Sequence, residues 1–195
     1  RAAMKDSYFL NSYWNTIVIT VSGTLVNLFM TTLFAYPLSR PDFMGRKFLM
    51  RCAVFTMFFT GGMIPTYMLV TDLGLGNTYW ALILPGAISV YNMIIMRTFF
   101  EGIPADLTEA AYIDGANDVR ILVSVILPLS KPILWTMVLF YAVGHWNGFF
   151  NALLYLSDKS QYPIQMFVRN VVLGGDTLSM AMTTYNSSTE VGAEM

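Results

Sequence analysis

Charged residues are scarce in this 195-residue chain, where they make up 12% of the sequence against the share of about 25% typical of soluble domains. Eleven Lys and Arg nearly balance twelve Asp and Glu, and the resulting formal charge of -1 excludes the basic balance typical of nucleic-acid binders. Apolar residues make up 55%, which excludes a disordered chain. A soluble domain of this size would lack the charge for a wetted surface, so we predict a membrane protein.

Cysteine and histidine each occur once, as Cys52 and His145. One cysteine excludes an internal disulfide framework and a Cys-rich metal site, and one histidine excludes a multi-His site. The four spans predicted below contain no carboxylate that could join His145 in an acid–base or Ser–His–Asp arrangement. We therefore expect no catalytic residue and no metal site, and a protein that is not an enzyme.

Four stretches without a charged residue are long enough for membrane-spanning helices, which need about 20 residues to cross a hydrocarbon layer of ~30 Å. Strands are disfavoured because segments such as Ile17–Val21 do not alternate, as the short strands of a β-barrel would. We predict an all-α membrane protein, a polytopic helical bundle that forms a single domain over residues 1–195. Its spans are expected at about 15–38, 52–69, 79–96 and 133–156.

Basic residues lie unevenly around the turns between these spans. Turns 39–51 and 97–132 hold seven Lys and Arg, whereas turn 70–78 and the two ends of the chain hold four. Turns rich in Lys and Arg stay on the cytoplasmic side of a membrane. We therefore expect turns 39–51 and 97–132 to be cytoplasmic.

The turn 97–132 is far longer than the usual connection of about 2–8 residues between helices, and long ordered loops tend to be functional. Pro104 and Asp106 suit the first turn of a short helix, and Gly115 suits its end, where a positive φ is needed. Asn117 or Asp118 can cap a second short helix.

The second helix is expected to run from this cap through 121–126, and the prolines within 127–132 are expected to end it. Such a helix pair is compatible with a simple linker on the membrane surface. Its small residues instead favour close packing against another backbone, since small side chains let that backbone approach. These residues are Ala110, Ala111, Gly115 and Ala116.

The segment Glu109–Ala116 reads EAAYIDGA and is followed at 126–128 by ILP. In composition, spacing and predicted cytoplasmic position it resembles the EAA motif of ABC importer permeases. The resemblance implies the type I importer permease fold, with a cytoplasmic coupling helix that docks onto an ATP-binding subunit. It assigns ATPase coupling to Glu109, Ala110, Ala111, Asp114, Gly115, Ala116, Leu127 and Pro128.

Further segments extend the resemblance over essentially the whole chain, among them Ala35–Arg40, Gly61–Tyr67 and His145–Asn147. They are similar to the carbohydrate-uptake branch of these permeases, which includes the maltose-type second permease. The greatest likeness is to permeases paired with sugar-binding lipoproteins in Gram-positive bacteria. The resemblance implies a multi-pass subunit of the bacterial plasma membrane that moves a sugar or oligosaccharide inward at the expense of ATP.

The partners implied by the resemblance are ABC ATPase subunits, a second permease subunit and an extracellular sugar-binding lipoprotein, with membrane lipid around them and no nucleic acid. The chain has no G-x-x-x-x-G-K-[ST] phosphate loop, so ATP and Mg²⁺ would belong to a partner and this chain would hold no cofactor. The alternative that the permease carries a non-sugar solute is left open by the sequence. A stand-alone carrier or channel is a weaker alternative, because the spans contain no acid and no clear repeat.

Polar residues inside spans usually face a partner or a cavity, because burying them in lipid is costly. Asn147 and Asn151 are four residues apart, which places them on one face of a helix, with His145 and Trp146 beside them. Helix–helix hydrogen bonding is the competing interpretation for such residues. The substrate-path candidates are Asn92, Tyr91, His145, Trp146, Asn147 and Asn151, and the other polar groups considered in the spans are Asn27, Thr31, Thr32 and Tyr141.

Gly61, Gly62 and Pro65 predict a broken or kinked end of the span 52–69, and a helix terminus is favoured over a gating hinge. Near the end of the chain, residues 162–173 are predicted as a short external helix. The family has a span before residue 1 and another after a stretch like Gly192–Glu194. The resemblance therefore implies that this chain lacks the first and last spans, by truncation or in a shortened form.

Overall fold

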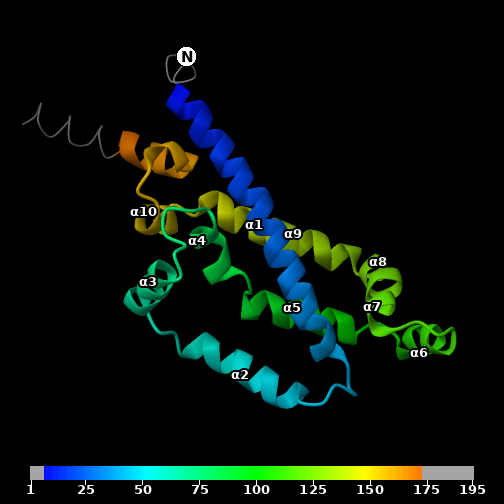
Figure 1. Ribbon diagram of the computed structural model, residues 1–195. Coiled ribbons are helices and arrows are strands. Elements are labelled where there is room, and N and C mark those ends of the chain that lie inside the picture. The colour runs from blue at the N-terminus through cyan, green and yellow to red at the C-terminus, as the bar shows by residue number, and fades with distance from the viewer. Residues whose placement is uncertain (1–6, 173–195) are drawn as a thin grey trace, which may run out of the picture.

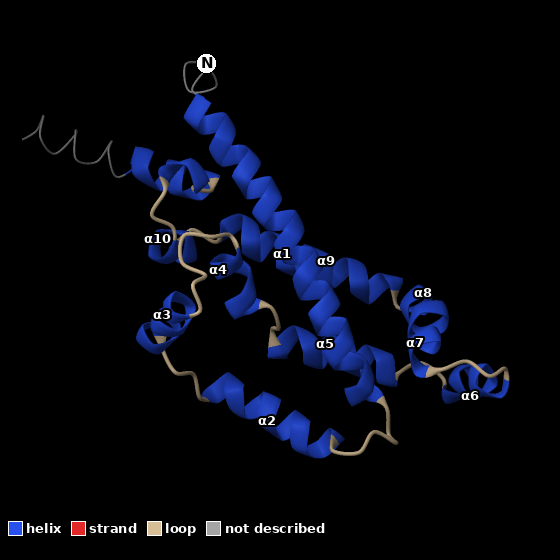
Figure 2. Ribbon diagram, in the orientation of Figure 1, coloured by secondary structure: helices blue, strands red, loops and turns tan. Residues whose placement is uncertain are grey.

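All regular structure is helical in the part of the chain that the computed structural model describes, residues 7–172 (Figure 2). The all-α fold expected from the sequence is therefore confirmed. In chain order the labelled helices are α1 (Ser7–Ser39), α2 (Arg46–Phe58), α3 (Met63–Asp72), α4 (Trp80–Ile83), η2 (Leu84–Gly86), α5 (Val90–Glu101), α6 (Ala105–Ile113), α7 (Asp118–Ile121), η3 (Leu122–Ile126), α8 (Leu127–Leu129), α9 (Lys131–Asn147), α10 (Phe150–Tyr155) and η4 (Lys159–Gln161), and an unlabelled helix follows over 164–172.

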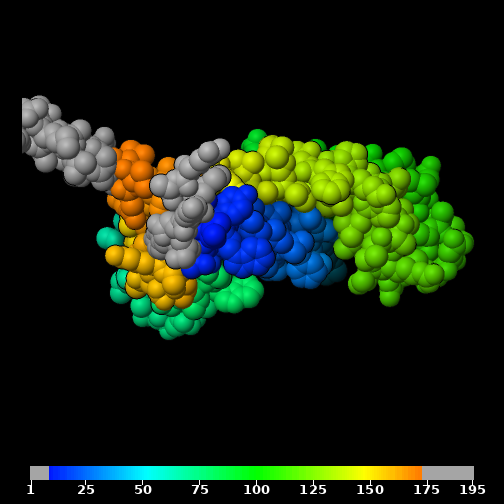
Figure 3. Space-filling view, turned by 90° about the horizontal axis from the view of Figure 1, so that it is seen from above, coloured from blue at the N-terminus to red at the C-terminus, as the bar shows by residue number. Residues whose placement is uncertain are grey.

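The long helix α1 forms the axis of the molecule. Its 33 residues measure about 50 Å at 1.5 Å per residue, more than a hydrocarbon layer of ~30 Å requires. The helix α9 lies beside it (Figures 1 and 3), and α5 packs against the same helix. Among the described helices, α1 is long and apolar enough to cross a membrane alone, and up to four spans result if each bent helix pair counts as one.

The segment expected as the span 52–69 is not one helix. It falls into α2 and α3, which meet at 113°. Gly62 lies between them with a φ of 83°, a conformation that L side chains rarely adopt and that glycine allows without steric cost. The break predicted at the glycine pair is thus confirmed, and it is more than a helix terminus because a new helix starts at Met63 directly after it.

The segment expected as the span 79–96 is also broken, with a bend of 54° between Trp80–Gly86 and α5. Ser89 has extended backbone dihedral angles and its hydroxyl accepts a hydrogen bond from the backbone N–H of Asn92, so α5 begins there with a polar cap. The amide of Asn27 on α1 donates to the carbonyl of Gly86 at 3.0 Å. This bond satisfies a carbonyl that the break leaves outside any continuous helix.

The segment expected as the span 133–156 is interrupted at its outer end. The helix α9 ends at Asn147, and α10 starts only at Phe150. Asn147 and Asn151 therefore do not share one helix face, and the i, i+4 argument drawn from their spacing is wrong. At its other end α9 meets the preceding helical segment at 83°, with the break at Ser130.

Two groups of buried apolar residues hold the helices together. The larger joins the second half of α1 to α2, α5, α7, η3 and α9, and its fully buried members include Met96, Ile121 and Met137. The smaller joins the first half of α1 to α4 and α10, and includes Ile19 and Ala152. The core is thus divided between the two ends of the bundle.

Polar residues at the start of α1 hold the last described segment. The Asn15 amide donates to the carbonyl of Ser160 at 2.6 Å, and the Thr16 hydroxyl accepts from the N–H of Ile164 at 2.8 Å. Residues 164–172 are helical, in agreement with the short helix expected over 162–173, whose last residue lies outside the described part. The Gly192–Glu194 stretch also lies outside it.

Candidate coupling loop and substrate path

The helix α6 carries most of the motif and ends in a glycine turn. Asp114 caps it, and Gly115 follows with a φ of 77°. The N–H of Ala116 donates to the carbonyl of Ala111 at 3.0 Å, and the N–H of Gly115 donates to the carbonyl of Tyr112 at 2.9 Å. These two bonds define a Schellman turn, which satisfies carbonyls that the end of a helix leaves without partners.

The second helical segment starts at a polar cap. The Asn117 side chain accepts a hydrogen bond from the N–H of Arg120 at 2.8 Å, as expected for one of the two predicted capping residues. Tyr112 on α6 donates its phenolic proton to the Asp118 carboxylate across the turn. This hydrogen bond raises the pKa of Tyr112, with partial burial and the charge of Asp118 as smaller causes. Sequence reasoning missed this pair, which ties α6 to α7.

The second segment starts directly after its cap and ends within 127–132, as expected. It begins at Asp118 and runs through α7, η3 and α8 to Leu129, so the break follows Pro128 and Pro128 itself does not end the helix. The middle stretch η3 is a π-helix, in which the N–H of Leu127 reaches back five residues to Leu122. A widened turn before Pro128 relieves the clash of the proline ring with the preceding turn, which explains why the helix continues.

The motif residues divide into an exposed set and an inward set. Ala111, Ala116 and Leu127 are partly buried and pack against the larger apolar group. The exposed residues are Glu109, Ala110, Asp114, Gly115 and Pro128. Glu109 makes no ion pair or side-chain hydrogen bond within the described part of the chain, so its carboxylate is available to a partner.

Apolar side chains near the motif are left uncovered. Ile113 is 86% exposed, and Leu107 and Tyr112 are also exposed. The helix α6 projects from the end of the bundle (Figure 1), and its side chains other than Thr108 and Ala111 are exposed. An exposed apolar surface of this kind, next to a carboxylate and small residues, is typical of a protein interface.

Charged side chains link helices at the same end of the bundle. Arg46 at the start of α2 and Arg97 on α5 both bind the carboxylate of Glu101. Arg97 also donates from Nε to the carbonyl of Leu38 at 2.9 Å, near the end of α1. Three helices are thus joined beside the coupling loop.

The structure places His145 in contact with α1. Its Nε2 atom lies 3.4 Å from Oδ1 of Asn27, the same residue that donates to Gly86. Trp146 packs edge to face against Tyr13, with ring centroids 6.0 Å apart. Tyr141 and Thr31 share a buried hydrogen bond of 2.6 Å. These side chains connect helices, which is the packing role weighed against substrate contact.

The remaining substrate-path candidates are separated. Tyr91 is exposed at the start of α5, whereas its neighbour Asn92 is buried. Asn147 and Asn151 are exposed, and Asn147 donates to the carbonyl of Val143 at 2.9 Å. Within residues 7–172, no hydrogen bond or ring contact joins Tyr91 or Asn92 to the segment 145–151. No three metal-ligating side chains lie close enough to hold an ion in the described part.

Comparison with known proteins identifies the class. Residues 28–185 match the family described as the binding-protein-dependent transport system inner membrane component, and the chain belongs to this family of ABC importer permeases. The resemblance drawn from the EAA motif is therefore confirmed, as is a multi-pass location in the plasma membrane.

Particular relatives extend this result. Protein LplC of Bacillus subtilis (strain 168) is 48% identical over 181 residues, covering 89% of this chain and 61% of LplC. The polygalacturonan/rhamnogalacturonan transport system permease protein YtcP of the same organism is 51% identical over 158 residues, covering 81% of this chain and 55% of YtcP. A solved bacterial ABC transporter involved in the import of the acidic polysaccharide alginate matches with a TM-score of 0.86 at 36% identity, covering 94% of this chain and 66% of that one. The chain thus spans little more than half to two thirds of these relatives.

Proposed function

We propose that the chain is the membrane-embedded part of a permease subunit in an ATP-driven importer of a sugar or oligosaccharide. The observation that carries this proposal is the projecting helix α6, whose motif residues Glu109, Ala110 and Gly115 are exposed beside the uncovered side chain of Ile113. Family membership supports a transport role, and the named substrates of the relatives support a carbohydrate cargo.

In this proposal α6 seats in a surface of an ABC ATPase subunit, which holds ATP and Mg²⁺. Glu109 would accept hydrogen bonds from the partner, and its charge would make them about twice as strong as neutral ones. Ala110 would let the partner backbone approach closely, and Ile113 would bury apolar surface on docking. Gly115 would hold the turn that presents these residues.

The same proposal assigns the motion to the bent helices. Closure of the ATPase subunits would shift the permease between inward-facing and outward-facing states. The inward motif residues Ala111, Ala116 and Leu127 pack on the core that joins α1, α5 and α9, so a displacement of α6 would reach the spans. A second permease subunit and a sugar-binding lipoprotein would complete the transporter.

The substrate path is proposed along the outer half of α9, the segment after it and the start of α5. Tyr91, Asn147 and Asn151 are exposed and offer a phenol and amides to a sugar. His145 and Trp146 would support this surface through their contacts with Asn27 and Tyr13. Asn147→Ala should slow uptake without loss of assembly, and a normal uptake rate would remove Asn147 from the path.

Co-purification with the ATPase subunit tests the coupling role. In the intact transporter, Ile113→Ser should lower the yield of bound ATPase subunit and the ATP hydrolysis stimulated by substrate, because an apolar contact is lost. Val171→Ser is the matched control, since Val171 is 57% exposed in the segment 164–172. Wild-type ATPase binding by Glu109→Lys and Ile113→Ser together would contradict the proposal.

Uptake into proteoliposomes tests the cargo. The transporter with its binding protein should be offered oligosaccharides of alginate and of polygalacturonan beside the neutral maltotriose. Saturable, ATP-dependent uptake of at least one of them is expected. If amino acids or peptides were taken up instead, the chain would serve a non-sugar importer.

A further inference from the structure

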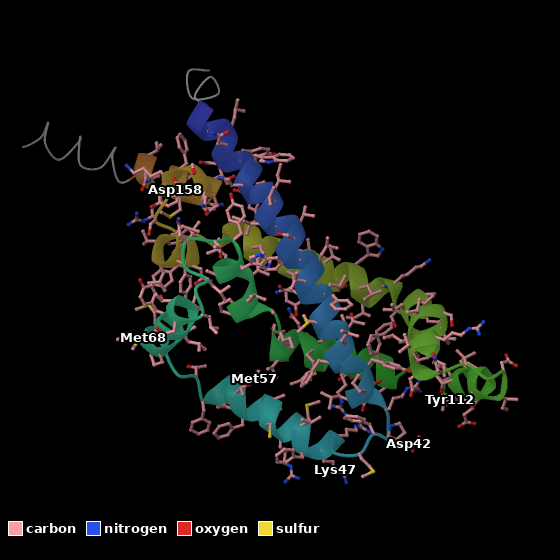
Figure 4. The ribbon with its side chains drawn as sticks, viewed as in Figure 1. Asp42, Lys47, Met57, Met68, Tyr112 and Asp158 are labelled. Carbon is pink, nitrogen blue, oxygen red and sulfur yellow. The ribbon has the colours of Figure 1, made fainter. Side chains whose placement is uncertain are left out.

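A cavity of about 770 Å³ opens beside the start of α2, at the end of the bundle that carries the coupling loop. It is lined by residues of the turn after α1, by the first turns of α2 and by Arg97 of α5. Four of its nine lining residues are basic: Arg46, Lys47, Arg51 and Arg97. Figure 4 shows Lys47 at the start of α2, next to the turn that holds Asp42.

The charge at this cavity is not balanced. Arg46 and Arg97 share the single carboxylate of Glu101. Within the described part, no carboxylate forms an ion pair with Lys47 or Arg51, and Arg51 donates from Nε to the carbonyl of Lys47 at 3.1 Å. The exposed Asp42 makes no ion pair there either. The N-terminus of α2 adds the positive end of a helix dipole, so the cavity favours an anion.

An apolar stripe leads away from the cavity along α2. Phe48 lines the cavity and is 64% exposed, and Phe55 and Phe58 are 57% and 77% exposed. Residues three or four positions apart, or seven, lie on the same side of a helix, so these rings follow one another down one face. A ligand with an anionic group and long apolar chains matches both parts, whereas a free anion would leave the stripe bare.

We propose that this cavity binds the phosphate headgroup of an anionic phospholipid, whose acyl chains lie along Phe48, Phe55 and Phe58. The predicted cytoplasmic position of the turn 39–51 places the basic cavity at the height of the headgroups, and the stripe points into the hydrocarbon layer. Basic pockets between membrane helices on the cytoplasmic side suit anionic headgroups in this way. The lipid would brace α2 against α5 beside the coupling loop.

Native mass spectrometry of the intact, detergent-solubilised transporter tests the site with equimolar phosphatidylglycerol and phosphatidylethanolamine as probes. The wild type should retain phosphatidylglycerol preferentially. Lys47→Gln with Arg51→Gln should weaken that retention on the order of tenfold, because two juxtamembrane cations are removed. Lys159→Gln with Arg169→Gln removes the same charge at the other end of the bundle and should leave retention unchanged.

The conservative exchange Lys47→Arg with Arg51→Lys should keep the lipid preference, and single Lys47→Gln serves if the double variant fails to assemble. An unchanged preference in the Gln variants would overturn the proposal. Displacement of the lipid by an equal concentration of soluble glycerol phosphate would assign the site to a free phosphate instead. Loss of the ATPase subunit with full lipid retention would assign it to a protein partner.

Discussion

At the scale of single residues, Gly23 shows how closely α1 and α9 approach each other. A Cβ atom built on Gly23 would lie 2.5–2.8 Å from three atoms of the His145 ring. Real Cβ atoms essentially never come so close to another heavy atom, so glycine at this position is required by the neighbouring ring. The imidazole in turn reaches Asn27, and the contact thus also positions the bond to Gly86.

Gly23→Ala should destabilise the protein by about 1–3 kcal/mol, because overpacking outweighs the better helix propensity of alanine. The melting temperature of the purified transporter measures this effect. Gly144→Ala on the facing helix is the control, since a Cβ there meets no described atom within 4 Å. His145→Ala should restore stability to the Gly23→Ala protein, and an unchanged melting temperature in Gly23→Ala alone would contradict the packing argument.

Tyr112 and Asp118 offer a second test at this scale. The hydrogen bond to Asp118 raises the pKa of Tyr112 above its ordinary value of 10.0. The bond therefore stabilises the folded loop below pH 10, and this contribution is lost as the pH rises through the raised pKa. Asp118→Asn should move the pKa back toward 10, as followed by NMR of ring-labelled tyrosine with Tyr112→Phe for assignment. Asp114→Asn should leave the titration unchanged; a titration unaffected by Asp118→Asn would refute the assignment.

At the scale of elements, local chemistry predicted the helix ends of the coupling loop well. Gly115 and Asn117 act through their own backbone and neighbouring N–H groups, so their roles can be recognised from sequence. The breaks within the spans depend on distant groups. Asn27 stabilises the break at Gly86 from 59 positions away, and Glu101 binds Arg46 from 55 positions away. A hydropathy profile reports such segments as single spans, because it depends on composition and not on bends in the helix.

The turn at Gly115 gives the prediction that belongs to this scale. Gly115→Ala should weaken the turn by about 1–2 kcal/mol, because an L residue is strained at a φ of 77° although no atom crowds its Cβ. Gly115→Asn should cost less, since asparagine visits this region more readily. The protection of residues 105–113 from hydrogen exchange and the rate of substrate-stimulated ATP hydrolysis should both fall in the order wild type, Gly115→Asn, Gly115→Ala.

Gly76→Ala is the control for this series, because its Cβ also meets open space while its φ lies outside the positive range. It should match the wild type in both measurements. A larger effect of Asn than of Ala at Gly115 would show that side-chain size, rather than backbone strain, decides the outcome.

At the scale of the whole molecule, the two ends of the bundle carry different chemistry. One end holds the coupling loop, the paired arginines at Glu101 and the basic cavity. The other holds the turns joined by Asn77, whose N–H donates to the carbonyl of Tyr155 and whose side chain accepts from the N–H groups of Ser157 and Asp158. The structure thus gathers turns 39–51 and 97–132 at one end, as the distribution of basic residues requires for a cytoplasmic face.

Site-directed labelling tests this orientation. Cys52 is the single cysteine of this sequence, so Cys52→Ser removes the one thiol that these 195 residues contain. In that background Lys159→Cys, at the end with few bases, should react with a membrane-impermeant maleimide on intact cells. Met44 is 92% exposed. The variant Met44→Cys should react only after the membrane is permeabilised. Labelling of Met44→Cys on intact cells would place the basic end outside, and α6 would then lie on the wrong side to reach a cytoplasmic ATPase.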